Sequence, residues 1–171
     1  MKKSVFCLMA FVMMACAAGA QTLEPSAFTV VFSTSDDGFL NVRDQPSMKG
    51  RVVTKLWIPM HGLGSGVLIE SGEKWSKVSV GKEIGWVYNK YLGYQSWYNG
   101  DGENKLVAAI DNMPVYTENY VDEDEGLPLF TTVKKGTVMA DQYDTWKEYY
   151  VLKTGHDYLF IKMTDVEVVK Q

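Results

Sequence analysis

The chain has 171 residues, and its 17 basic and 21 acidic side chains give a formal net charge of −4 at pH 7. Only two of the basic residues are arginines, Arg43 and Arg51, so the composition argues against a nucleic-acid backbone as the partner. Aromatic residues make up 13% of the chain, which suits small β-structures that have little core to bury.

The first 20 residues are predicted to be a cleaved signal peptide. Two lysines begin the chain, an apolar stretch follows, and small residues precede Gln21. We expect cleavage after Ala20 and an exported protein, periplasmic or secreted, with no transmembrane segment in the mature chain. The alternative is an outer-membrane lipoprotein attached through Cys16, since the preceding residues loosely resemble a lipoprotein cleavage box. Cys7 and Cys16 both lie in this leader, so no disulfide is expected in the mature chain.

Short runs of apolar and β-branched residues alternate with turn residues along the rest of the chain, and no stretch has convincing helical spacing. In the first half, strands are expected at 28–32, 39–43, 51–58, 67–70, 75–80 and 84–88. Residues 94–104 combine turn residues with aromatics and are interpreted as a linker. In the second half, strands are expected at 106–110, 114–117, 129–133, 137–140, 149–153, 158–163 and 166–169. The chain is therefore predicted to be all-β, with two domains at 28–93 and 105–169.

A spaced signature occurs once in each half. Trp75 precedes Trp86 by 11 residues, and a leucine follows Trp86 after 6 more. Tyr149, Phe160 and a valine repeat both spacings at an offset of 74 residues. A repeat of this kind indicates one small folding unit that is used twice.

Three motifs of the first half occur in an order typical of one family. They are Leu40-Asn41-Val42-Arg43 with Pro46-Ser47 behind it, Trp75-Ser76-Lys77-Val78, and Gly85-Trp86-Val87-Tyr88-Asn89-Lys90-Tyr91-Leu92. In these motifs the chain resembles the bacterial Src-homology-3-like (SH3b) family. The second half is similar to a degenerate copy, with Lys134-Lys135-Gly136 at the family's central turn. The resemblance implies two tandem small SH3-like β-barrels, a shallow aromatic groove, and binding that often targets cell-wall enzymes to peptidoglycan.

Three aromatic side chains of the first copy form the predicted ligand site. Alternation along 75–80 directs the valines to the core and leaves Trp75 on the opposite face. The resemblance places Tyr88 and Tyr91 in the groove. Flat rings suit a sugar ring or an extended peptide, and each phenol adds a hydrogen-bonding group. The alternative is that these three residues are half-buried packing residues.

The second copy is expected to lack most of this aromatic platform. Tyr149, Lys162 and Asp165 occupy the positions that match Trp75, Tyr88 and Tyr91 in the first copy. Two further aromatic residues, Trp86 and Phe160, are interpreted as core residues because each lies inside an apolar triplet.

The predicted function is a non-catalytic exported binding module of the bacterial cell envelope. Its ligand is peptidoglycan, another glycan or an extended peptide, bound in the groove of the first barrel. The alternative is an accessory or inhibitor subunit that binds another envelope protein through an exposed linker, at Trp97 and Tyr98, and through the second barrel.

No enzymatic activity, cofactor or metal is expected. The mature chain has no cysteine nucleophile, and His61 and His156 belong to no recognisable triad or zinc pattern. Glycines around 62–66 lack the lysine and hydroxyl residues of a phosphate-binding loop. The acidic stretch 118–126 lacks the spacing of a calcium loop. A carboxylate pair for glycoside cleavage stays open, because its geometry is three-dimensional.

Overall fold

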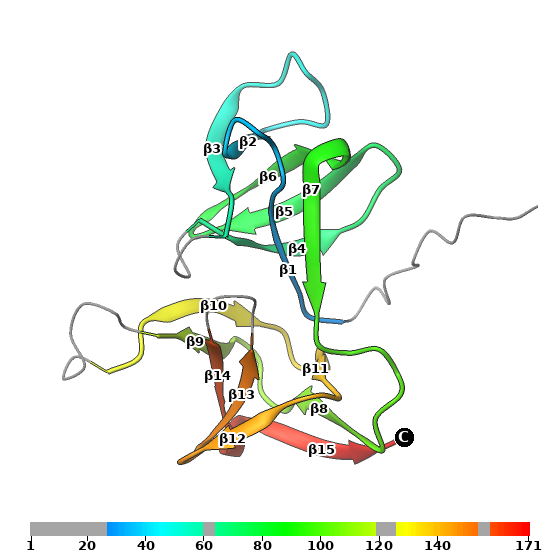
Figure 1. Cartoon of the computed structure of the whole chain (residues 1–171), viewed down its shortest axis with the longest axis vertical. Coiled ribbons are helices and arrows are strands. Elements are labelled where there is room, and N and C mark those ends of the chain that lie inside the picture. Colours follow the sequence, from blue (N-terminus) through cyan, green and yellow to red (C-terminus); the bar gives the residue numbers. More distant parts are fainter. Residues whose placement is uncertain (1–26, 60–63, 119–125, 154–157) are drawn as a thin grey trace, which may run out of the picture.

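The computed structural model describes residues 27–59, 64–118, 126–153 and 158–171. In these ranges the regular elements are strands and two short 3-10 turns, so the all-β prediction is confirmed (Figure 1). The predicted leader, both histidines and residues 119–125 of the acidic stretch lie outside the described residues.

The first unit contains seven strands in one antiparallel sheet. Its elements are β1 (Thr29–Ser33), β2 (Phe39–Arg43), β3 (Val52–Trp57), β4 (Gly66–Glu70), β5 (Trp75–Val80), β6 (Glu83–Tyr88), the 3-10 turn η1 (Asn89–Tyr91) and β7 (Leu92–Ser96). The strand order is β3-β2-β6-β5-β4-β1-β7. Tight turns connect strands that are adjacent in this order. In the β5–β6 turn, for example, Gly81 adopts a positive φ of 57°.

The second unit repeats the pairing order of the first with eight strands. Its elements are β8 (Asn104–Ala108), β9 (Met113–Thr117), β10 (Leu129–Val133), β11 (Val138–Ala140), β12 (Asp144–Trp146), β13 (Tyr149–Lys153), β14 (Tyr158–Lys162), the 3-10 turn η3 (Met163–Asp165) and β15 (Val166–Lys170). Two sheets, β10-β9-β14-β13-β12 and β11-β8-β15, follow the order of the first unit, with β12 and β11 in the place of β4.

The repeated signature has a structural counterpart. β5 and β13, η1 and η3, and β7 and β15 begin 74 residues apart, as the sequence spacing predicts. The register agrees as well: Trp75 pairs with Tyr88, and Tyr149 pairs with Lys162. The strand orders are open in the part of the chain that the structure describes, and no pairing closes either unit. The two-barrel prediction therefore stays a prediction.

Each unit has its own apolar core. The first core contains the buried residues Val31, Val42, Leu56, Val78, Val87 and Leu92. The second core contains the buried residues Phe28, Val30, Trp97, Leu106, Ala108, Met113, Val115, Val133, Met139, Ala140, Leu152, Leu159 and Ile161. Three of these residues, Phe28, Val30 and Trp97, come from the ends of the first unit. The second core is therefore completed by the first unit.

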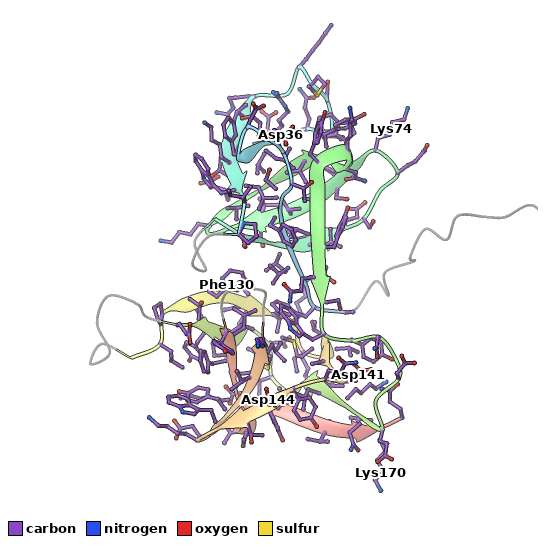
Figure 2. All side chains as sticks on the ribbon, in the orientation of Figure 1. Asp36, Lys74, Phe130, Asp141, Asp144 and Lys170 are labelled. Carbon is purple, nitrogen blue, oxygen red and sulfur yellow. The ribbon has the colours of Figure 1, made fainter. Side chains whose placement is uncertain are left out.

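The chain enters and leaves the first unit through this shared core. β1 and β7 pair along their whole length and run side by side toward the second unit (Figure 1). Alternation in β1 directs Val31 into the first core and Val30 into the second. The Phe28 amide donates a hydrogen bond to the Val138 carbonyl at 2.7 Å, which extends the contact to β11. Figure 2 shows Phe130 of β10 on the side of the second unit that faces the first, where it packs against the shared core.

The predicted linker is shorter than the sequence indicates. Residues 94–96 belong to β7, because Tyr94 and its neighbours pair with β1. The connection from residue 97 to β8 is fixed to the second unit by Asp141, which is labelled in Figure 2. Its carboxylate accepts hydrogen bonds from the amides of Gly100 at 2.8 Å and Gly102 at 3.2 Å.

Candidate functional site

Trp75 and Tyr88 form an aromatic pair on the outer face of the first unit. They lie opposite each other on β5 and β6, and their ring centroids are 5.4 Å apart with a tilt of 54°. Their neighbours Ser76 and Val87 are fully buried, which confirms the predicted alternation along β5. Tyr88 is 37% exposed and Trp75 is half-buried, so the pair offers ring surface to solvent.

The turn before β5 positions Trp75 next to Tyr88. Asn89, which follows Tyr88, donates a side-chain hydrogen bond to the Gly72 carbonyl at 2.7 Å. The Asn89 amide donates to the Lys74 carbonyl at 3.0 Å. At Gly72 a Cβ atom would lie 2.5 Å from the Trp75 carbonyl oxygen, so only glycine fits the turn without a shift of backbone. These contacts hold the two strand ends together.

Tyr91, the third predicted site residue, lies on η1 beside Lys90. Tyr91 is 39% exposed on η1, and the Lys90 ammonium lies 4.9 Å from its ring centroid. A hydrogen bond to the Tyr91 side chain, with smaller electrostatic contributions from Tyr91 and Tyr88, raises the pKa of Lys90 above its ordinary value. Lys90 therefore adds a positive charge beside the Tyr91 ring. Lys90 was not predicted as a site residue, although it stands between Tyr88 and Tyr91 in the sequence.

Trp86 is not the core residue that its apolar neighbours predicted. Gly85 and Val87 are buried, whereas Trp86 is half-buried on the same outer face as Trp75. Lys77 is its cross-strand partner, with the ammonium 5.9 Å from the ring centroid. The prediction was wrong because Gly85 packs against Val42 and Arg43 with no side chain of its own, which sets the alternation so that Trp86 faces outward.

The predicted linker site is corrected at Trp97. Its side chain is 9% exposed, stacks on Phe28 with centroids 5.9 Å apart, and donates from Nε1 to the Lys153 carbonyl at 2.8 Å. A residue held in this way presents no ring to a partner. Tyr98 is half-buried, and its hydroxyl lies 3.3 Å from the side-chain oxygen of Gln171.

The second unit carries an aromatic cluster that the sequence analysis did not predict. Tyr116, Trp146, Tyr149 and Phe160, called here the second-unit ring cluster, form four ring contacts with centroids 5.7 to 6.3 Å apart. Phe160 is buried as expected, but it packs among these rings. Trp146 is 45% exposed, and the Lys147 ammonium lies 4.1 Å from its ring centroid. The expected loss of the aromatic platform is therefore wrong, because β9 and β12 supply rings that the matched positions do not include.

The described parts of the chain do not offer a cluster of metal ligands. They contain no group of three or more histidine, cysteine, aspartate or glutamate side chains that could hold a metal ion. Over the same residues, no helix is long and apolar enough to cross a bilayer. The expectation of a non-enzymatic protein stays a prediction.

Comparison of the sequence with protein-family models gives no match, and comparison with curated proteins gives none either.

Proposed function

We propose that the chain is an exported, non-catalytic binding module of the bacterial cell envelope. Its first unit acts as an SH3-like barrel that binds its ligand through Trp75, Tyr88 and Tyr91. The observation that supports this proposal most is the contact between Trp75 and Tyr88 at 5.4 Å, together with the exposure of 37% at Tyr88 and 39% at Tyr91. Strand pairing already holds the Trp75 and Tyr88 rings in place, so little conformational entropy is lost when they stack on a ligand.

The chemistry of the trio favours peptidoglycan as the ligand. A tryptophan ring stacks on the apolar face of a sugar, and two phenols supply hydrogen-bonding groups beside it. The Lys90 ammonium, 4.9 Å from the centroid of the Tyr91 ring, would pair with a carboxylate of a stem peptide. Peptidoglycan offers sugars and carboxylates on the same polymer. Export by the predicted leader, or attachment through Cys16, would bring the module to it.

Co-sedimentation with purified sacculi tests this proposal. The wild-type mature chain is expected in the pellet, and Trp75→Ala and Tyr88→Ala are expected to lower the bound fraction at least about tenfold, the usual loss when a central aromatic contact is removed. Tyr158→Ala is the matched control, because Tyr158 is a tyrosine of similar exposure, 36%, in the second unit. Circular dichroism checks that each variant is folded. Equal sedimentation of the folded Trp75→Ala and wild-type chains would refute the trio as the site.

One observation favours the second candidate function, an accessory or inhibitor subunit that binds an envelope protein. The second-unit ring cluster places Trp146, 45% exposed, on β12 beside Lys147. Exposed tryptophans with neighbouring cations are frequent centres of protein interfaces. Co-purification of one defined protein that is lost in Trp146→Ala and kept in Trp75→Ala would favour this function over sacculus binding.

A further inference from the structure

Positive charge is concentrated in one hairpin of an acidic protein. From Phe39 to Ile69 the chain has four basic residues and one acidic residue, whereas the whole chain has a net charge of −4. The basic residues are Arg43, Lys49, Arg51 and Lys55. The single carboxylate, Asp44, lies 3.4 Å from Arg51 and is already paired. The β2–β3 hairpin therefore has an excess of positive charge toward solvent.

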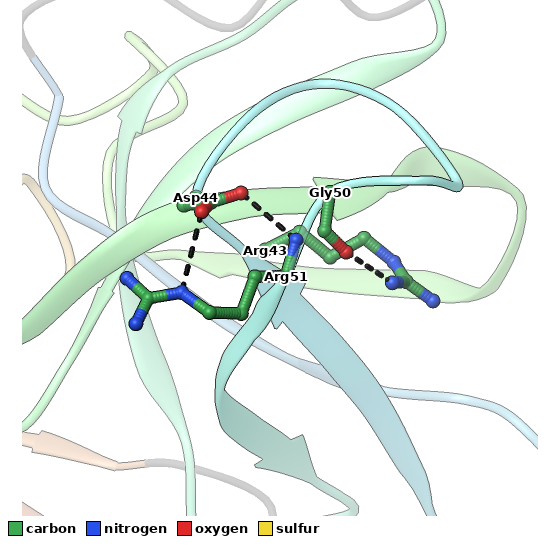
Figure 3. A network of polar contacts seen from close by, with 4 residues as sticks. All are labelled: Arg43, Asp44, Gly50 and Arg51. Carbon is green, nitrogen blue, oxygen red and sulfur yellow. Dashed lines mark hydrogen bonds and ion pairs between the residues drawn. The ribbon is translucent and has the colours of Figure 1, made fainter.

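Polar contacts fix the shape of this hairpin, as Figure 3 shows. The Arg51 amide donates to Asp44 Oδ1 at 2.9 Å. The Asp44 amide donates to the Arg51 carbonyl at 3.0 Å. The Arg43 guanidinium donates to the Gly50 carbonyl at 2.6 Å. The strand that follows, β3, therefore leaves the turn in a defined direction.

Lys55 lies between two aromatic rings on the outer face of β3. Its ammonium is 3.7 Å from the ring centroid of Phe39 and 5.4 Å from that of Trp57, and the two rings contact each other at 5.3 Å. Among the described residues the Asp44–Arg51 contact is the one ion pair found, so no carboxylate neutralises Lys55. Trp57 is 45% exposed. The group combines a positioned cation with apolar ring surface.

The backbone beside Lys55 is free to pair with another strand. β3 is the terminal strand of its sheet and pairs with β2 alone, at the border of the first unit (Figure 1). The Trp57 amide donates to Gly64 at 2.9 Å on the side away from β2. That side is therefore occupied at Trp57, and strand alternation directs the Lys55 amide, two residues earlier, to the same side, where no described strand pairs with it. Extended peptides add to such edges through backbone hydrogen bonds.

We propose that the edge of β3 binds an extended acidic segment of a protein partner as an added strand. A carboxylate of that segment pairs with Lys55, and the methylene groups of its acidic side chains, on the same face of the added strand, contact the rings of Phe39 and Trp57. The residues of this site are other than Trp75, Tyr88 and Tyr91, and the proposal does not depend on the function proposed for those three. The unpaired backbone edge favours a peptide as the ligand, because a polysaccharide would leave the backbone groups of this edge unpaired.

Calorimetric titration of the mature full-length chain tests the proposal. The probe is a synthetic peptide of about ten alternating glutamate and valine residues, long enough for one added strand. The glutamate peptide is expected to bind, and the same peptide with lysine in place of glutamate is not. Lys55→Glu and the milder Lys55→Met are expected to weaken binding at least about tenfold. Lys82→Glu changes an exposed lysine of the β5–β6 turn by the same charge, and is expected to stay within about twofold of wild type.

Two N-methylated peptides separate strand addition from simple charge attraction. In the proposed pairing, the glutamate opposite Lys55 donates its backbone amide to the Lys55 carbonyl. Methylation of the glutamate amides is therefore expected to abolish binding. Methylation of the valine amides, which point away from β3, is expected to be tolerated. Equal binding of both methylated peptides would overturn the proposal. The proposal would also be overturned if the chain bound polygalacturonate and Lys55→Glu weakened that binding as much as peptide binding. A dimer of the free chain that Lys55→Glu dissociates would overturn it as well. Trp75→Ala is expected to leave peptide binding unchanged. The proposal for the β3 edge and the proposal of sacculus binding can therefore be refuted separately.

Discussion

Trp97 illustrates how a single aromatic residue can join two folded units. Its ring is 9% exposed, stacks on Phe28 and donates a hydrogen bond to the Lys153 carbonyl in β13. The neighbouring Tyr94, on the same chain segment, is 38% exposed. The sequence could not distinguish these two residues, because both stand among polar and turn residues. What buries Trp97 is a contact with a strand that lies more than fifty residues away in the chain.

Truncation of Trp97 tests whether its ring joins the two units. Trp97→Ala is expected to lower the free energy of unfolding by about 3–5 kcal/mol, because it leaves a cavity in the shared core. Trp97→Phe keeps a ring but loses the hydrogen bond to Lys153, and is expected to cost about 1–2 kcal/mol. Tyr94→Ala, a ring removal on the same segment, is expected to cost less than about 1 kcal/mol. Urea denaturation measures all three. A loss below about 1 kcal/mol in Trp97→Ala would mean that the ring is not buried as described.

The strands show which elements a sequence pattern can predict. β2, β5, β10 and β13 coincide with the strands expected from alternation, and the 11-residue and 6-residue spacings predicted how the two copies align. β7 and β12 were missed. β12 is three exposed residues long, so it has no alternation to detect. β7 contains Gly93, which usually indicates a break, yet here a Cβ would lie 2.2 Å from the Phe32 ring, so glycine is required by packing.

The candidate site was predictable only where one strand determines it. Trp75 follows from alternation along β5 and Tyr88 from the resemblance to SH3b motifs, and the structure brings the two into contact. The positions of the lysines beside the rings, and the second-unit ring cluster, could not be predicted in this way, because they depend on residues from other strands. Tyr116 and Trp146 reach Tyr149 from β9 and β12, which no local pattern places side by side.

The turn between β4 and β5 is the element that carries the second stability prediction. A Cβ at Gly72 would lie 2.5 Å from a backbone oxygen, which cannot move without displacing Trp75. Gly72→Ala is therefore expected to cost about 1–3 kcal/mol in urea denaturation and to weaken sacculus binding. Gly81→Asn is the matched control: its φ of 57° suits asparagine and no atom lies within 4 Å of the added Cβ. A Gly72→Ala chain as stable as Gly81→Asn would contradict this account of the turn.

At the scale of the whole molecule, one pairing order supports two different surfaces. In the first unit the rings of Phe39, Trp57 and Trp86 lie beside lysines, and Trp75 pairs with a tyrosine. In the second unit four rings pack on one another, and Trp146 also lies beside Lys147. These additional ring contacts stabilise the second sheet and bury Phe160. The first unit is the proposed ligand-binding half because Tyr88 and Tyr91 are both exposed and Lys90 lies beside Tyr91.

The shared core holds the first and second units together. Phe28, Val30 and Trp97 extend from the first unit into the core of the second. The same contacts bury apolar area that would face water if the units separated. The proposed binding surfaces of the two units are therefore held on one molecule through packed contacts as well as through the chain.

The five tryptophans, at 57, 75, 86, 97 and 146, allow one direct test of the central claim, that the first unit binds envelope ligand through its outer ring pair. Indole N–H resonances of the mature chain are followed by NMR during titration with soluble peptidoglycan fragments. The account predicts that the Trp75 indole shifts with ligand, while the indole of Trp97, hydrogen-bonded in the shared core, does not. A titration in which Trp146 shifts and Trp75 stays constant would contradict it and assign the ligand to the second unit.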